Sequence, residues 1–235
     1  MPLRVSFIIA SYNYGRFVGQ TVKSLLAQTF DGLEIIVIDD CSHDDSREVL
    51  CQFANEPRVR LVFHETNQGK GGALATAIGE ARGEILIIQD ADLEYDPADY
   101  VAILRPIEAG RADVVYGSRF RGSAENRVQN FWHTVGNRLL TLIANVFTDL
   151  NLTDMATCYK AFHRRVVPAL HLESKRFGVD AEITVKVAHG GFRIFEVPVS
   201  YFARSRAEGK KIRLFDGFSA LGALVRYSFA GRPPR

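Results

Sequence analysis

Three observations predict that this chain of 235 residues adopts an α/β fold, with a mainly parallel sheet, helices on both faces and a variable C-terminal half. Short apolar runs alternate with helical patterns through residues 1–117, which is typical of successive βα units. With 47% hydrophobic and 24% charged residues, the chain can bury a full core. Four of the apolar runs end in polar residues, and such folds bind ligands at the carboxyl edge of the sheet.

In the first half, strands and helices are predicted in strict alternation. Apolar runs predict strands at 5–10, 34–38, 59–63, 85–89 and 113–116. The segments between them predict helices at 17–28, 44–53, 71–82 and 97–108. Asp96 and Pro97 suit the N-cap and the first position of the last of these helices. These predictions place the ends of the first four strands at one edge.

After residue 118 the alternation becomes looser. A loop rich in Arg, Gly, Ser and Asn runs to residue 130, and apolar residues between 139 and 147 then predict an amphipathic helix. A strand is expected near 158–162, a helix near 181–189, a strand near 192–197 and a final amphipathic helix at 214–229. No repeat or linker is visible, so we expect one domain covering 1–235.

Composition excludes several classes of protein. A net charge of +2 is too small to indicate nucleic-acid binding. Cys41, Cys51 and Cys158 show no metal-ligand spacing, and their odd number favours a reducing cytoplasm over a disulfide scaffold. No signal-peptide pattern follows Met1, and no apolar stretch approaches the roughly 18 residues of a membrane span. We expect a cytoplasmic protein whose contact with the membrane, if any, is peripheral or through a membrane-protein partner.

The most informative motif is Asp90-Ala91-Asp92, which ends the apolar run at 85–89. Two carboxylates at a strand end suit a divalent cation held against a diphosphate, because Mg²⁺ and Mn²⁺ accept hard oxygen ligands together with phosphate oxygens. Aspartates after a strand can also form a turn or cap a helix. Since Asp96 and Pro97 already provide that cap, a metal- and nucleotide-binding role is favoured.

Other polar segments are expected at the same edge. Asp39 and Asp40 follow the 34–38 run, and either could accept hydrogen bonds from a nucleobase or ribose, although helix capping is the alternative. The glycine-rich turn around Lys70 opens a helix and would either bind an anion or simply shape the turn. Basic residues gather around Arg119 and again in a later segment with Arg204, Lys210 and Lys211.

Six motifs in this order resemble family 2 glycosyltransferases, most closely the dolichol-phosphate mannosyltransferases and their bacterial polyprenyl-phosphate relatives. They are Ser11-Tyr12-Asn13, Ile38 to Ser42, Asn67 to Gly71, Asp90-Ala91-Asp92, Gly117 to Phe120 and Asp154 to Phe162. The resemblance implies a GT-A fold, a GDP- or UDP-sugar donor, Mg²⁺ or Mn²⁺, and inversion at the anomeric carbon. Residues 1–117 would bind the nucleotide sugar, and residues 118–235 would bind the acceptor.

The resemblance also implies roles for individual residues. Asp92 would be the principal metal ligand, and Asp90 would share metal and ribose contacts. Glu94 stands where relatives often have a glutamine, so it would either tighten the metal or turn away from it. Arg119 would bind the donor diphosphate or the acceptor phosphate. The remaining donor-binding candidates are Ala10, Ser11, Tyr12, Asp39, Asp40, Lys70, Ala91, Arg204, Lys210 and Lys211.

The acceptor decides whether a general base is needed. A polyprenyl phosphate is largely dianionic at neutral pH, because its second pKa is about 6, and it needs no base. A hydroxyl acceptor on a saccharide or protein would need one, with Asp180 or Glu182 as the candidates, and Glu182 is the one we include with Asp92 and Arg119. We expect transfer to a polyprenyl phosphate. The alternatives are a hydroxyl acceptor or a non-catalytic subunit that binds nucleotide sugars.

Overall fold

The chain forms one seven-stranded sheet in the order β3-β2-β1-β4-β6-β5-β7. This computed structural model describes residues 4–29, 32–122, 126–176, 178–204 and 214–229. The strands are β1 (Val5–Ser11), β2 (Leu33–Asp39), β3 (Val59–Phe63), β4 (Ile85–Asp90), β5 (Val114–Ser118), β6 (Lys160–His163) and β7 (Ile194–Pro198). All neighbouring strands are parallel except β6, which is antiparallel to both β4 and β5. The mainly parallel α/β fold is therefore confirmed.

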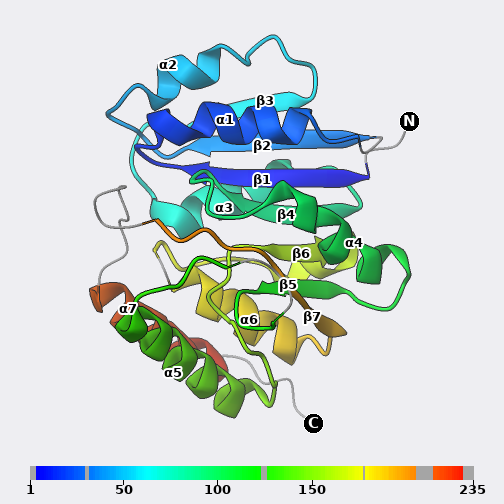
Figure 1. Cartoon of the computed structure of the whole chain (residues 1–235), viewed down its shortest axis with the longest axis vertical. Coiled ribbons are helices and arrows are strands. Elements are labelled where there is room, and N and C mark those ends of the chain that lie inside the picture. Colours follow the sequence, from blue (N-terminus) through cyan, green and yellow to red (C-terminus); the bar gives the residue numbers. More distant parts are fainter. Residues whose placement is uncertain (1–3, 30–31, 123–125, 177, 205–213, 230–235) are drawn as a thin grey trace.

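Helices connect the strands and cover the sheet (Figure 1). They are α1 (Gly15–Leu26), α2 (Ser46–Cys51), α3 (Gly69–Glu80), α4 (Tyr100–Glu108), α5 (Phe131–Thr148), α6 (Val179–His189) and α7 (Leu214–Phe229). Two short 3-10 helices, Pro97–Asp99 and Arg164–Ala169, complete the fold, and the sequence pattern did not predict the second. As predicted, the Asp96 side chain accepts a hydrogen bond from the N–H of Ala98 at the start of the first.

The main core lies on both sides of β1, β2 and β4. Their side chains are buried almost without interruption, which explains why these strands read as continuous apolar runs rather than alternating ones. A smaller cluster lies between α5, α6 and α7 and includes Met155, Val185 and Leu224. In Figure 1, α5 and α7 lie side by side at one end of the molecule. No helix among the described segments is both long and apolar enough to cross a membrane.

Candidate active site

The carboxyl ends of β1, β2 and β4 bring the predicted donor-binding residues together. In the parallel register, Ser11 pairs with Asp39 on one side, and Ala10 pairs with Asp90 on the other. Tyr12 follows β1 and is partly exposed, and its ring contacts the ring of His43 edge-on at 6.4 Å. The predicted convergence of these strand ends on one edge is confirmed.

Asp39 and Asp40 have different environments. Asp40 is buried, and its Oδ1 accepts hydrogen bonds from His64 and from the N–H of Gln68, both at 2.8 Å. Its Oδ2 accepts the N–H of Gly69 at 2.7 Å. Asp40 therefore holds the start of α3, and both of its carboxylate oxygens are used. The ligand-binding role expected for either aspartate stays a prediction, and of the two only Asp39 has a carboxylate oxygen without a hydrogen-bond partner among the described residues.

Asp39 keeps one carboxylate oxygen free for a ligand. Its Oδ2 accepts hydrogen bonds from Arg47 Nε at 2.8 Å and from the N–H of Ser42 at 3.1 Å. Its Oδ1 and the neighbouring Ser11 Oγ are buried and have no hydrogen-bond partner among the described residues. A buried polar atom without a partner costs about 1–3 kcal/mol, so two of them side by side indicate a place where a polar ligand binds.

The loop after β4 meets the segment that follows β7, drawn in orange in Figure 1. Arg204 Nη2 lies 2.8 Å from Asp92 Oδ2, and Arg204 Nε lies 3.2 Å from Glu94 Oε1. The Tyr201 hydroxyl donates to Glu94 Oε2 at 2.5 Å. Both oxygens of Glu94 are thus engaged by Arg204 and Tyr201. Its role towards the metal stays a prediction.

Asp92 is surrounded by negative charge. Burial raises the pKa of its carboxyl to about 7, the neighbouring Asp90 and Glu94 add to this, and Arg204 opposes it. Asp90 is less enclosed, and Lys70 Nζ lies 3.1 Å from its Oδ1. Lys70 therefore lies at the carboxylate pair, as expected for a donor-binding residue. Two crowded carboxylates favour the arrival of a cation.

The donor set fits a magnesium or manganese ion that is completed by its substrate. Across the described part of the chain, no group of three or more His, Cys, Asp or Glu side chains is gathered to hold a metal. Asp90, Asp92 and Glu94 are not gathered into such a group, and their role as metal ligands stays a prediction. A site formed by Asp90 and Asp92 would be sufficient, because Mg²⁺ is commonly held by one or two carboxylates together with substrate phosphates and water.

A second ionic cluster lies next to this pair. Lys160 is fully buried, and its Nζ donates to Asp180 Oδ1 at 2.5 Å and to the carbonyl of Thr157. Burial alone would raise the pKa of Asp180, but the Lys160 and Lys70 ammonium groups outweigh it and lower that pKa. Asp180 is consequently held as an anion.

Glu182 is engaged in a different way. Its two carboxylate oxygens accept the N–H groups of Glu173 and Ser174, both at 2.8 Å, and Lys186 Nζ at 2.7 Å. Burial would raise its pKa, but these hydrogen bonds lower it below the ordinary value. Glu182 is fully buried and holds the 173–174 segment against α6. This position does not suit the general base for which Glu182 was a candidate.

Arg119 forms a buried bidentate pair with Asp154. Its Nε and Nη2 lie 2.6 and 2.8 Å from the two carboxylate oxygens, and its guanidinium lies 5.0 Å from the centre of the Tyr201 ring. Asp154 balances much of its charge. The expected contact with phosphate stays a prediction.

Other expectations have mixed outcomes. Lys210 and Lys211 lie outside the described residues. Ala91 is buried between the two aspartates, and its expected contact with the donor stays a prediction. Sequence reasoning missed the roles of Lys160 and Tyr201, and it included Asp154 only as part of a motif. In the sequence, the one signal of a special role for Lys160 was that a lysine lies between apolar residues at the start of a strand.

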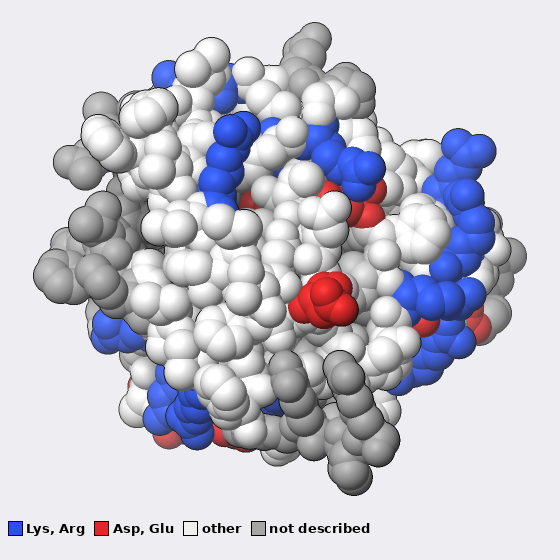
Figure 2. All heavy atoms as spheres, turned by 90° about the horizontal axis from the view of Figure 1, so that it is seen from below, with Lys and Arg blue, Asp and Glu red and all other residues white. Residues whose placement is uncertain are grey.

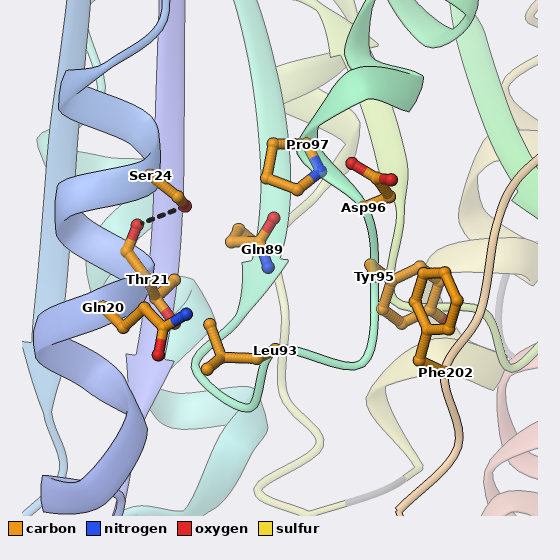
Figure 3. Close-up of a pocket in the computed structure, with 9 residues that line it drawn as sticks. All are labelled: Gln20, Thr21, Ser24, Gln89, Leu93, Tyr95, Asp96, Pro97 and Phe202. Atoms are coloured by element: carbon orange, nitrogen blue, oxygen red, sulfur yellow. Dashed lines mark hydrogen bonds between the residues drawn. The ribbon is translucent and has the colours of Figure 1, made fainter.

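Two hollows lie beside the site. One, of about 210 Å³, is on the α1 side of the loop after β4, where Gln20, Gln89 and Phe202 face it (Figure 3). The other, of about 480 Å³, lies between the 173–178 segment and α7. It adjoins the start of α3, because the N–H of Gly71 donates to the carbonyl of Lys175 at 3.1 Å. The 173–178 segment therefore packs against the start of α3 on one side and borders the second hollow on the other.

Comparisons with known proteins identify relatives of this chain and support its fold. The undecaprenyl-phosphate mannosyltransferase of Micrococcus luteus is 30% identical over 218 residues, which cover 88% of this chain and 87% of that protein. Glycosyltransferase AglD of Haloferax volcanii is 29% identical over 209 residues, or 85% of this chain, but the match spans 33% of that longer protein. The crystal structure of glucosyl-3-phosphoglycerate synthase from Mycobacterium tuberculosis with Mn²⁺ and UDP-glucose superposes with a TM-score of 0.75 at 17% identity, covering 96% of this chain and 79% of that one. Residues 6–170 match the model of glycosyl transferase family 2, and the chain belongs to that family.

Proposed function

We propose that this enzyme transfers a sugar from a nucleoside diphosphate sugar to a polyprenyl phosphate, with inversion at the anomeric carbon. The name of the Micrococcus relative, an undecaprenyl-phosphate mannosyltransferase, supports this acceptor. The two partnerless oxygens of Ser11 and Asp39, the carboxylates of Asp90 and Asp92, and the Lys70 ammonium support the donor. The donor is a UDP- or GDP-sugar.

The choice of a phosphate acceptor over a hydroxyl acceptor is based on one observation, the ionised state of Asp180 and Glu182. Asp180 is held as an anion by the buried Lys160, and Glu182 is held as an anion by three N–H donors. The pKa values of both carboxyls are lowered, which makes them weak proton acceptors at neutral pH. A hydroxyl nucleophile needs a stronger base, whereas a phosphate monoester is already ionised.

The reaction follows from these charges. An oxygen of the acceptor phosphate attacks the anomeric carbon, and the bond from that carbon to the donor's β-phosphate oxygen breaks. The electron pair leaves on the nucleoside diphosphate, so negative charge accumulates beside Lys70 and Arg204, where preorganised cations stabilise it. Asp90 and Asp92 would hold Mg²⁺ or Mn²⁺, which supplies further charge stabilisation for the leaving diphosphate. Asp39 orients the nucleoside.

A lipid acceptor places the enzyme at the membrane surface. We propose peripheral attachment at the cytoplasmic face, either by the chain's own surface or through a membrane-protein partner. The second hollow, between the 173–178 segment and α7, is the proposed path for the acceptor, because Lys175, Arg176 and Arg226 line it beside the donor edge.

The test is a transfer assay with purified protein, Mn²⁺ or Mg²⁺, labelled UDP- and GDP-sugars, and undecaprenyl or dolichyl phosphate. We expect one donor to give a lipid-linked sugar and EDTA to abolish its formation. Formation of no lipid-linked sugar from any donor, with transfer to a saccharide instead, would contradict the acceptor assignment. Binding of nucleotide sugars without any transfer would indicate the non-catalytic subunit.

A double variant separates the two acceptor classes more sharply. Asp180→Asn alone would leave Lys160 buried without its anion, which costs about 3–5 kcal/mol. The double variant Lys160→Met with Asp180→Asn removes both charges and should fold. We expect its turnover with polyprenyl phosphate to stay within about tenfold of the wild type, whereas loss of a general base costs about 10²–10⁴-fold.

A further inference from the structure

The outer face of α5 carries an apolar stripe that nothing in the described structure covers. Trp132 is 76% exposed and Val146 is 75% exposed, and Val135, Leu139 and Leu142 between them are also exposed. At about 100° per residue, these five side chains fall within an arc of about 80°. Residues on the opposite side of the helix, among them Thr141 and Ala144, are buried against the α5–α6–α7 cluster. A helix that is apolar on both sides has a second partner.

The stripe continues onto α7. The rings of Phe147 and Phe229 lie 6.1 Å apart, and Phe229 and Val225 are exposed beside α5. Phe131 extends the stripe at the start of α5, where its ring contacts Trp132 at 5.1 Å. We call this surface the α5 face, made up of Phe131, Trp132, Val135, Leu139, Leu142, Val146, Val225 and Phe229. Monomeric soluble proteins seldom expose a continuous apolar surface of this kind.

The charges around the α5 face indicate what covers it. No Asp or Glu occurs within Phe131–Thr148, whereas Arg138 lies on α5 itself, and Arg121 and Arg127 precede it. Figure 2 views the end of the molecule where α5 and α7 lie: Lys and Arg lie on several sides of a broad area with few charged side chains, although acidic groups are also visible within it and near its edge. A basic rim around an apolar centre complements an anionic lipid surface, and aromatic residues such as Trp132 favour the headgroup boundary.

The face also lies beside the proposed acceptor path. α7 lines the second hollow with Gly222, Ala223 and Arg226, and on its other side it packs against α5. Within α5, Asn137 Nδ2 donates to Asp154, the partner of Arg119. The α5 face therefore lies on elements that also contact the second hollow and the Arg119–Asp154 pair.

We infer that the α5 face docks on an anionic lipid bilayer, with α5 lying in the plane of the headgroups and Trp132 inserted at its N-terminal end. The inference rests on the proposed function only for the expectation that the enzyme contacts a membrane. The residues of the α5 face, and the experiment on them, are different from those of the proposed active site. A second copy of this chain is the competing occupant.

Trp132 is the only tryptophan in the chain, so its fluorescence reports directly on the face. We expect vesicles of phosphatidylglycerol and phosphatidylcholine to shift its emission to shorter wavelength and to protect it from acrylamide. Vesicles of phosphatidylcholine alone should bind more weakly. The double variant Leu139→Ser with Leu142→Ser keeps the reporter and should partition at least tenfold less. Val101→Ser, at an exposed apolar residue on α4, is the matched control and should bind as the wild type.

Two further readouts distinguish the outcomes. An unshifted Trp132 signal, or equal binding by the double variant, would overturn the inference. So would a lipid-free dimer in sedimentation that becomes monomeric in the double variant. With a short-chain isoprenyl phosphate in solution, wild type and double variant should turn over equally, whereas with a long-chain acceptor in vesicles the variant should lose at least tenfold. If neither acceptor is used but Trp132 still shifts on vesicles, the proposed function fails and the docking surface stands.

Discussion

At the scale of single residues, Asp92 combines burial with crowding by other carboxylates. Replacing it with Asn removes a charge that its surroundings disfavour, so we expect Asp92→Asn to fold with little loss of stability. The same change removes a hard oxygen ligand, so Mn²⁺-dependent binding of the nucleotide should weaken at least tenfold. Calorimetric titration of UDP and GDP with and without Mn²⁺ measures this. Unchanged metal-dependent affinity in the variant would remove Asp92 from the metal site.

Unlike Asp92, Glu182 is expected to stabilise the fold through its negative charge. Glu182→Gln loses charge-assisted bonds to the N–H groups of Glu173 and Ser174 and to Lys186, so we expect a loss of about 2–3 kcal/mol in the free energy of unfolding. Because the folded-state pKa is lowered, the ionised carboxylate contributes its stability at pH above about 4.5 and loses it as the pH falls further through the folded-state pKa.

Urea unfolding at pH 7 and near pH 3.5 checks this prediction. The difference between wild type and Glu182→Gln should be large at pH 7 and should shrink in acid. Glu48→Gln, at an exposed position on α2, is the matched control and should differ from the wild type by no more than about 0.5 kcal/mol at either pH. A folded Glu182→Gln variant that loses transfer by a factor of a hundred or more would restore Glu182 as a general base.

At the scale of elements, Asp39 and Asp40 separate binding from folding. Asp40→Asn weakens two hydrogen bonds that fix the start of α3 and one that holds the His64 ring, so we expect it to cost about 2 kcal/mol of stability. Asp39→Asn should weaken nucleoside diphosphate binding at least tenfold with a smaller effect on stability. Urea unfolding and calorimetry on both variants test the division. Equal losses of affinity in the two variants would argue against it.

Element boundaries were predictable where burial imposes a pattern. β1, β2 and β4 are covered on both faces, so each appears in the sequence as an unbroken apolar run. The insertion of β6 between β4 and β5 was not predictable, because strand order is set by pairing between residues far apart in the chain. The 3-10 helix Arg164–Ala169 escaped prediction because it is short and contains Pro168.

The candidate site was predictable to a similar extent. Asp90 and Asp92 follow a strand, and local sequence was enough to place them. The orientation of Glu94 depends on Tyr201 and Arg204, more than 100 residues away, and no local pattern encodes such contacts. The ion pair of Lys160 and Asp180 has the same origin in tertiary packing. Local sequence therefore placed the candidate carboxylates at one edge of the sheet, whereas the contacts that each of them makes come from the tertiary fold.

At the scale of the whole molecule, the two halves of the chain are joined through the sheet and across the site. β6 comes from the second half, yet it is paired with β4 of the first half through Leu86 with Phe162 and Ile87 with Ala161, all fully buried. Arg204 adds ion pairs from the second half to Asp92 and Glu94 of the first. A fragment of residues 1–117 would expose the apolar edge of β4 and lose these contacts.

We therefore expect the chain to unfold as one cooperative unit. Calorimetry should show a single transition whose van't Hoff enthalpy equals the calorimetric enthalpy, and residues 1–117 expressed alone should lack a cooperative transition. Phe162→Ala, in the second half, should cost about 3–5 kcal/mol and lower the midpoint of the whole transition, since the side chain fills the core beside β4. Two resolved transitions, of which Phe162→Ala shifts only one, would show that the nucleotide-binding half is a domain in its own right.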